Sequence, residues 1–232
     1  MRLLALDTSS PACSVALQLG SDVWQRYELQ PREHTRLLMP MVRAVLDDGG
    51  ATLAELDAIV LGNGPGSFIG MRIAASVAQG LAHGAGLDIV PVSSLAAVAA
   101  EVLATSTARQ VLVAQDAHMS EVYLGVFQRG ADELPELVFP ERLQGYMPID
   151  ELNAADARGR VAAGAGWQRY PQLTALNEAL FEAQVKVLHP RASFLLPSGA
   201  AGFRDGYTVK PADVAPAYLR HKVAERPASD AP

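Results

Sequence analysis

The stretch that decides the fold runs from Arg2 to Leu29 and reads RLLALDTSSPACSVALQLGSDVWQRYEL. It contains three segments rich in apolar and β-type residues, at 2–6, 13–19 and 23–29, with short polar turns between them. Short apolar segments bounded by Ser, Asp and Gly are typical of strands, and turns of this length join antiparallel neighbours. The sequence therefore predicts a three-stranded antiparallel meander at its start.

Beyond the meander, helical and strand-like stretches alternate. Apolar spacing predicts helices over 35–48, 69–83 and about 94–103, and compact apolar runs predict strands at 56–61 and 88–92. The order β-β-β-α-β-α-β-α differs from a Rossmann pattern, in which single strands alternate with single helices. It is the order of one half of an actin-like (RNase H-like) α/β protein.

The pattern restarts near residue 111. Segments 111–114 and 121–128 again indicate a strand hairpin, and the remainder is irregular, with short strands expected at 160–163 and 185–188. We therefore predict an α/β protein with two actin-like lobes, the second one reduced. The predicted units are an N-terminal lobe at 1–104, a degenerate C-terminal lobe at 110–224 and a tail at 225–232.

Composition limits the classes of function. Half of the 232 residues are hydrophobic and the formal net charge is −6, which favours a folded chain and argues against an extended nucleic-acid-binding face. Any role near RNA is then indirect or confined to a small patch. The single cysteine, Cys13, excludes an internal disulfide and favours a reducing compartment. No apolar stretch approaches the roughly 20 residues that span a bilayer, so we expect a cytoplasmic protein without membrane contact.

Three motifs at the ends of predicted strands suggest a degenerate nucleotide site. A carboxylate with hydroxyls can order a hydrated cation, and glycines before a helix N-terminus allow close approach of a phosphate. The glycine loop lacks the G-K-[ST] ending of a Walker A motif, and all three motifs are equally compatible with ordinary turn and packing roles. The candidate residues of this vestigial nucleotide site are Asp7, Ser9, Gly64, Gly66, Ser67 and Asp116.

These motifs, together with Pro216 and the run Tyr218-Leu219-Arg220, occur in an order that resembles the bacterial TsaB (YeaZ) family. The matching segments are 6–9, 64–68, 70–73, 116–117, 121–123 and 216–220. The resemblance extends from residue 2 to about 224. Ile69, Met71 and His118 stand where the family more often has Thr, Leu and Arg.

The resemblance implies a fold of two actin-like lobes and a function without catalysis. A chain of this family binds and supports TsaD, which forms N6-threonylcarbamoyladenosine next to the anticodon of tRNAs reading A-starting codons. The implied partners are TsaD in a heterodimer, TsaE in a ternary complex, a second copy of the chain in a homodimer when TsaD is missing, and tRNA only through the complex.

The comparison with TsaD-like chains also bears on metal binding. Those chains carry two metal-binding histidines after the corresponding strand, where this sequence has Ser94 and Val98. Serine is a poor neutral ligand and valine is none. We therefore expect no bound metal, no cofactor and no catalytic residue, so that surfaces would carry the function.

Two helices are the expected docking surface. The helix from about 69 carries small residues that would let another helix approach closely, and the helix at 35–48 is rich in Met and Leu. The alternative is that both stripes form the core of the chain itself. The expected docking residues are Leu38, Met41, Val42, Val45, Gly70, Ile73, Ala74, Val77 and Ala78.

Two other functions compete with this one. A nucleotide-dependent phosphotransferase of the actin-like superfamily would use Asp7, Asp116 and the glycine loop, although the chain is short for a two-lobe kinase. A peptidase would need a metal pair or a serine paired with histidine; the histidines are widely separated in the sequence, and Ser9, Ser10 and Ser67 have no evident partner.

Overall fold

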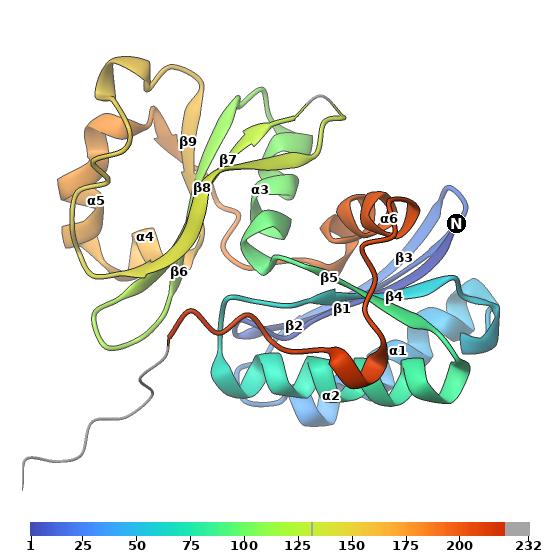
Figure 1. Cartoon of the computed structure of the whole chain (residues 1–232). Helices are drawn as coiled ribbons and strands as arrows, with labels where there is room; N and C mark the ends of the chain where they lie inside the picture. Colours follow the sequence, from blue (N-terminus) through green and yellow to red (C-terminus); the bar gives the residue numbers. More distant parts are fainter. Residues whose placement is uncertain (131, 221–232) are drawn as a thin grey trace, which may run out of the picture.

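The computed structural model describes residues 1–130 and 132–220, and places two five-stranded mixed sheets beside each other (Figure 1). The first sheet has the order β3-β2-β1-β4-β5 and the second β10-β9-β6-β7-β8. The expected tail at 225–232 and the last four residues of the expected second lobe lie outside the described residues. Within that described part, no helix combines the length and apolar character that crossing a membrane requires.

The predicted meander is confirmed as the start of the first sheet. Its strands are β1 (Arg2–Asp7), β2 (Ala12–Leu19) and β3 (Asp22–Leu29), and all neighbours are antiparallel. β4 (Ala58–Gly62) and β5 (Asp88–Val92) add to β1 in parallel. The order of strands and helices predicted for the first half is therefore the one observed.

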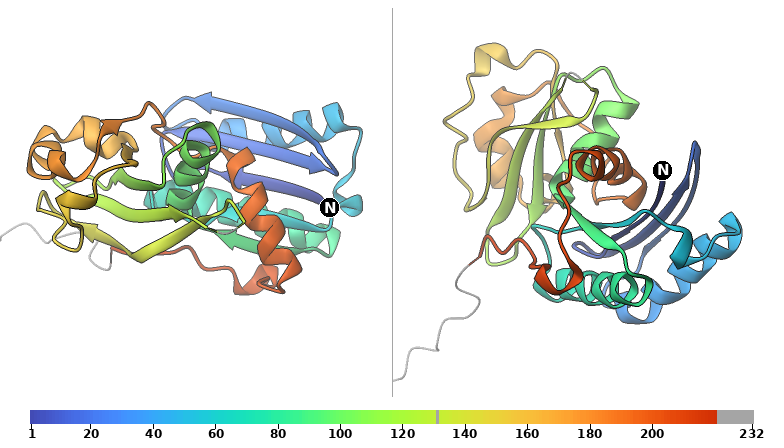
Figure 2. Two further views of the ribbon diagram at one scale, coloured as in Figure 1. Left: turned by 90° about the horizontal axis from the view of Figure 1, so that it is seen from above. Right: turned by 45° about the vertical axis from the view of Figure 1, so that its right-hand side comes forward.

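Both faces of the first sheet are covered. α1 (His34–Gly49) and α2 (Phe68–Ala85) cover the face that carries Leu4 and Leu6, whereas α6 (Leu196–Arg204) covers the face that carries Leu3 and Ala5 (Figure 2). Successive side chains of β1 point to opposite faces of the sheet. Because β1 is apolar almost throughout, helices must cover both faces to keep these side chains from water. Cys13 is buried beneath α1 and α2, where burial raises the pKa of its thiol to about 12.

The second sheet repeats this arrangement with shorter helices. It consists of β6 (Gln110–Asp116), β7 (Val122–Arg129), β8 (Pro135–Gln144), β9 (Arg160–Ala163) and β10 (Ala183–Gln184). One face packs on α3 (Ser94–Thr105), and the other on α4 (Ala165–Arg169) and α5 (Pro171–Asn177).

The two halves exchange covering helices. α3 follows β5 of the first sheet in the sequence but packs on the second sheet, and α6 follows the strands of the second sheet but packs on the first. The predicted division at 104–110 therefore separates the strands of the two sheets in the sequence, but each sheet needs a helix from the other side of that division.

Parts of the second half differ from the sequence-based prediction. β8, α4, α5 and α6 were not expected, and the strand predicted at 185–188 is instead the two-residue β10 just before it. α6 contains Gly199, at which an added Cβ would lie 2.5 Å from Val60. The helix is glycine-rich because it packs directly on β4, and glycine is a poor indicator of helix in a sequence.

Candidate functional site

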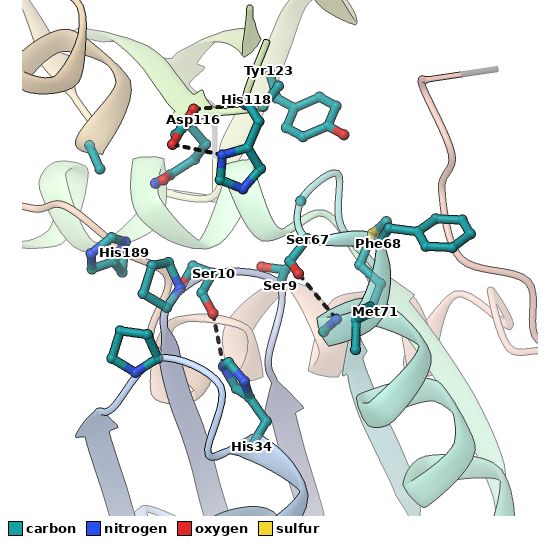
Figure 3. A pocket seen from close by; sticks show the side chains of 18 of the residues that line it. Ser9, Ser10, His34, Ser67, Phe68, Met71, Asp116, His118, Tyr123 and His189 are labelled. Carbon is teal, nitrogen blue, oxygen red and sulfur yellow. Dashed lines mark hydrogen bonds and ion pairs between the residues drawn. The ribbon is translucent and has the colours of Figure 1, made fainter. Parts of the chain in front are cut away.

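A cleft of about 1150 Å³ lies between the two halves, where the turns after β1 and β6 face each other (Figure 3). Its walls come from the β1–β2 turn, the N-terminal end of α2, the β6–β7 turn, α4 and the end of the described chain. Ser9, Gly66, Ser67 and Asp116, four of the six nucleotide-site candidates, line this cleft. The structure thus brings the β1–β2 turn, the glycine loop and the β6–β7 turn to one cleft.

Asp7 lies beneath the cleft and is only 1% exposed. Its Oδ1 accepts hydrogen bonds from the Ser9 backbone N–H and hydroxyl, each at 2.8 Å, and its Oδ2 accepts one from the Ser94 hydroxyl at 2.6 Å. Burial raises the pKa of Asp7, while these three donors act in the opposite direction. The carboxylate is thus fully engaged with its own chain and does not line the cleft.

The glycine loop packs against the β1–β2 turn. An added Cβ at Gly66 would lie 2.2 Å from the Ser9 carbonyl oxygen, and one at Gly70 would lie 1.9 Å from that of Thr8. The Ser67 N–H donates to the Ser9 carbonyl at 2.6 Å, and the Thr8 hydroxyl donates to the Gly70 carbonyl at 2.7 Å. These two glycines are therefore needed for close packing of chain on chain, which is the alternative role considered above.

Gly64 has a different reason to be glycine. Its φ is +85°, in the left-handed region, and its N–H donates to the Ser94 hydroxyl at 3.0 Å. Gly64 is buried and does not line the cleft. Ser94 accordingly connects the glycine loop to Asp7.

Asp116 does line the cleft, but its carboxylate also has partners. Oδ1 accepts hydrogen bonds from the Tyr170 hydroxyl at 2.5 Å and the His118 N–H at 2.8 Å, and Oδ2 lies 3.4 Å from His118 Nδ1. Burial, followed by the contact with Asp116, raises the pKa of Tyr170. His118, Met119 and Ser120 all have positive φ, an unusual run for residues other than glycine, and the first two of them line the cleft.

Sequence reasoning assigned no role in the cleft to His189, Arg169 or Tyr218. His189 Nδ1 is buried without a hydrogen-bond partner among the described residues, and burial lowers the pKa of this ring. Tyr218 belongs to a recognised motif, but only the structure shows what it contacts. Its hydroxyl accepts a hydrogen bond from Arg72 Nε at 3.0 Å, and the Arg72 guanidinium lies 3.7 Å from the centre of the Phe68 ring.

The end of the described chain holds the two halves together beside the cleft. The Ala217 N–H donates to the Asn63 carbonyl in the first half at 3.0 Å. Arg220 donates to the Ala117 carbonyl at 2.8 Å and pairs with Glu121 at 2.5 Å in the second half. The C-terminal motif therefore has a structural role that its sequence alone did not indicate.

The geometry offers little for hydrolysis by a serine. The hydroxyl of Ser9 donates to Asp7, while those of Ser10 and Ser67 accept backbone N–H groups of Ala12 and Gly70. His34 Nε2 lies 2.9 Å from the Ser10 carbonyl oxygen, so this ring contacts backbone. Within residues 1–130 and 132–220, no serine hydroxyl is hydrogen-bonded to a histidine ring.

The two positions compared with metal-binding histidines are both buried. Ser94 is 2% exposed and uses its hydroxyl as described, and Val98 is fully buried in the core between α3 and the second sheet. The described residues contain no group of three or more His, Cys, Asp or Glu side chains placed to hold a metal ion.

The expected docking residues need a correction. Seven of the nine are buried, and a side chain without exposed surface cannot touch a partner directly. The buried residues are Leu38, Met41, Val42, Val45, Gly70, Ala74 and Ala78. They belong to the inner sides of α1 and α2, because apolar spacing marks first the face that packs on the sheet. Ile73 and Val77 are half-buried and are the two that reach the surface.

Two sheets with this strand order, exchanged helices and a cleft between the strand-end turns define an α/β protein of the actin-like class. A family model described as "TsaD: tRNA N6-adenosine threonylcarbamoyltransferase" matches residues 28–226. The tRNA threonylcarbamoyladenosine biosynthesis protein TsaB of Escherichia coli is 39% identical over 97% of this chain and 96% of its own length. The protein of the same name from Haemophilus influenzae is 35% identical, over 96% and 95%.

Solved structures agree. YeaZ from Pseudomonas aeruginosa superposes with a TM-score of 0.83 at 36% identity, covering 94% of this chain and 99% of its own. An uncharacterised protein with similarity to peptidase YeaZ, from the same organism, gives a TM-score of 0.87 at 37% identity with the same coverage. The chain belongs to the TsaB (YeaZ) family.

Proposed function

We propose that this chain is a non-catalytic subunit that binds and supports TsaD in the formation of N6-threonylcarbamoyladenosine. The modified adenosine would lie next to the anticodon of tRNAs that read A-starting codons, and the modification reaction would take place in the cytoplasm. The names of the full-length relatives support the pathway. TsaE would join as a third partner, and tRNA would be modified by the assembled complex.

One observation carries the non-catalytic part of the proposal. The Ser94 hydroxyl bonds both Asp7 and the Gly64 N–H at a position closed to solvent. A group that binds a cation or a phosphate needs a free donor or acceptor facing the ligand. Here the carboxylate, the hydroxyl and the glycine loop satisfy one another, which favours a role by contact over turnover. The same observation disfavours the phosphotransferase.

The outer face of α2 is the proposed contact surface. Ile69 is 70% exposed, Ile73 and Val77 are half-buried, and they succeed one another at intervals of four residues. Gly80 continues the row, and a Cβ built there would have no neighbour within 4 Å. An apolar row beside open space allows a partner helix to approach closely. We propose that TsaD occupies this face, and that a second copy of the chain occupies it when TsaD is missing.

Charged substitutions on this face test the docking. Ser76 and Gly80 are exposed, so Ser76→Glu with Gly80→Glu should leave the fold intact and abolish co-purification with TsaD. Gln172→Glu with Ala175→Glu adds the same charge at exposed positions of α5 and should leave the pairing unchanged. Retention of TsaD by the first variant would place the contact elsewhere. Ala78, which lies in the core, is unsuitable because a charge there would unfold the chain.

A further inference from the structure

A second cavity, of about 650 Å³, lies at the edge of the second sheet and is lined by four arginines: Arg109, Arg129, Arg158 and Arg160. The topology explains why they meet. β9 runs parallel to β6 and β7 runs antiparallel to it, so the starts of β6 and β9 and the end of β7 lie at the same end of the strands. In the register, Gln110 of β6 lies between Gln128 and Arg160.

This end of the second sheet is opposite to the end that faces the cleft. Asp116 ends β6 at the cleft, whereas Arg109 precedes the start of the same strand. β6 has 7 residues, and at about 3.3 Å per residue its ends lie about 20 Å apart. The arginine cavity is thus separate from the site described above.

Arg160 keeps a positive charge inside the protein, and no carboxylate of residues 1–130 or 132–220 lies at ion-pair distance from it. It is 4% exposed, and its Nε donates to Gln110 Oε1 at 2.9 Å. Its Nη1 donates to the carbonyls of Asn153 and Leu180 at 3.2 and 3.1 Å, so the protein acceptors found for this guanidinium are all neutral. Burial lowers the pKa of Arg160, and Asp156 at the cavity wall acts against this. A buried cation of this kind gains from an anion placed beside it.

Arg129 is also held in place, by the end of α3. Its Nη2 donates to the carbonyls of Leu103, Ser106 and Ala108, and its Nη1 pairs with Glu133. A guanidinium at a helix C-terminus satisfies the last carbonyls of that helix. Two of the four arginines are therefore fixed in position before any ligand arrives.

Arg109 and Arg158 supply the free charge. Both are exposed, and neither lies within 4 Å of a carboxylate among the described residues. Arg109 Nη2 donates to the Arg158 carbonyl at 2.6 Å, which keeps the two residues adjacent. The nearby acidic groups are Asp156 and Glu182, and the Glu182 carboxylate accepts the Gly159 N–H at 3.0 Å.

We propose that this cavity binds a backbone phosphate of RNA. Guanidinium groups match the oxygens of a phosphate in pairs, and the exposed Arg109 and Arg158 provide such donors beside the buried positive charge of Arg160. On a chain with a net charge of −6, four arginines at one cavity make a local contact and do not form an extended nucleic-acid face. The choice of RNA over a free phosphate ion rests on the proposed function in tRNA modification.

The test uses the purified chain and fluorescein-labelled unmodified tRNA, with anisotropy measured between low and physiological salt. The variant Arg109→Gln with Arg158→Gln should weaken binding about fivefold or more, and should make the dependence of log K on log salt shallower by about one to two. The control, Lys186→Gln with Arg204→Gln, removes the same charge at exposed positions outside the cavity and should change affinity less than twofold.

Inorganic phosphate distinguishes the two sources of the ligand. If RNA is the ligand, tens of millimolar phosphate should displace tRNA from the wild type more than equal ionic strength of chloride does, and the variant should lack this difference. Equal loss of tRNA binding in both double variants would overturn the proposal. So would an unchanged tRNA affinity in the cavity variant, or the absence of measurable tRNA binding by the wild-type chain.

Failure of this proposal and failure of the proposed function are separable. Binding of tRNA to the purified chain is measured without TsaD, so a chain that fails to pair with TsaD would still report on the cavity. Conversely, a chain that pairs with TsaD and supports modification, while its cavity variant binds tRNA normally, would refute the cavity proposal alone.

Discussion

Asp7 and Ser94 meet in a region closed to solvent, at 1% and 2% exposure, although 87 residues separate them in the sequence. The carboxylate there accepts three hydrogen bonds, and the serine both donates to it and accepts from Gly64. A strand-end carboxylate is typical of nucleotide sites, but here the hydrogen bonds of Asp7 and Ser94 hold together the β1–β2 turn, the glycine loop and the start of α3.

Ser94→Ala should therefore destabilise the fold. The substitution removes a donor from Asp7 Oδ2 and the acceptor of the Gly64 N–H, and leaving buried polar groups unpaired costs about 1–3 kcal/mol for each. Urea denaturation should show this loss in the free energy of unfolding. Ser76→Ala, at an exposed position of α2, is the control and should stay within about 0.5 kcal/mol of the wild type. An unchanged midpoint for Ser94→Ala would contradict the network.

Glu141 gives a prediction in pH. It is half-buried and accepts a hydrogen bond from the Ser93 hydroxyl, and burial raises its pKa to about 6 from a usual 4.5. Because the folded-state pKa is raised, the proton favours folding, and this contribution is full below pH 4.5 and lost as the pH rises through about 6. Glu141→Gln keeps an acceptor for Ser93 and should stabilise the chain at pH 7–8 by at most about 2 kcal/mol, since one pKa unit corresponds to about 1.4 kcal/mol.

The measurement is the difference in unfolding free energy between the two proteins at pH 4.5 and at pH 7.5. The gain from Glu141→Gln should be largest at pH 7.5 and nearly absent at pH 4.5. A constant difference across this range would show that the ionisation of Glu141 is not coupled to folding.

Contacts of single residues could be predicted only where the two partners are close in the sequence. The position of Ser9 after β1, of Ser67 before α2 and of Asp116 at the end of β6 could be predicted from the sequence, because each follows from local apolar spacing. The hydrogen bond from Ser94 to Asp7 could not be predicted from the sequence, because the two residues belong to elements far apart in the chain. Nothing in the sequence around His189 or Arg169 forms a recognised motif, so their place at the cleft could not be predicted.

α2 begins where Ser67 accepts the Gly70 N–H at 3.2 Å, and it ends at Gly86 in the left-handed region. Between these points its glycines have opposite surroundings. At the scale of the element, Gly70 touches the β1–β2 turn, whereas Gly80 faces open space. The helix thus packs closely on the β1–β2 turn at Gly70 and is open to solvent at Gly80.

This contrast predicts opposite effects for the same substitution. Gly70→Ala would place a Cβ 1.9 Å from the Thr8 carbonyl oxygen, so the turn or the helix must shift, and we expect a loss of about 3 kcal/mol or more. Gly80→Ala relieves the low helix propensity of glycine and should stabilise the fold by about 0.5–1 kcal/mol. Thermal unfolding of the two variants checks both signs. Equal effects would show that the close contact at Gly70 does not matter.

Elements were predictable where their apolar period was strong. The strands and helices of the first half follow directly from spacing. The same spacing misassigned the docking residues, because it marks the side of α1 and α2 that packs inward. α6 was missed since its glycines, required for contact with β4, oppose a helical assignment.

The whole molecule is held together by parts that cross between its halves. α3 and α6 are exchanged between the sheets, and the segment ending at Arg220 contacts Asn63 on one side and Glu121 on the other. Such crossing contacts limit movement of the halves around the cleft. A molecule held together in this way suits the two surfaces proposed above, the outer face of α2 and the arginine cavity, because their residues keep fixed positions.

The most direct test is a titration of this chain into TsaD, TsaE, tRNA and the threonylcarbamoyl-adenylate donor, with modified tRNA as the readout. We expect no product from the chain by itself, and a rate that rises with added chain and levels off when its amount equals that of TsaD. Modified tRNA formed by the purified chain without TsaD would show that the chain is itself a catalyst.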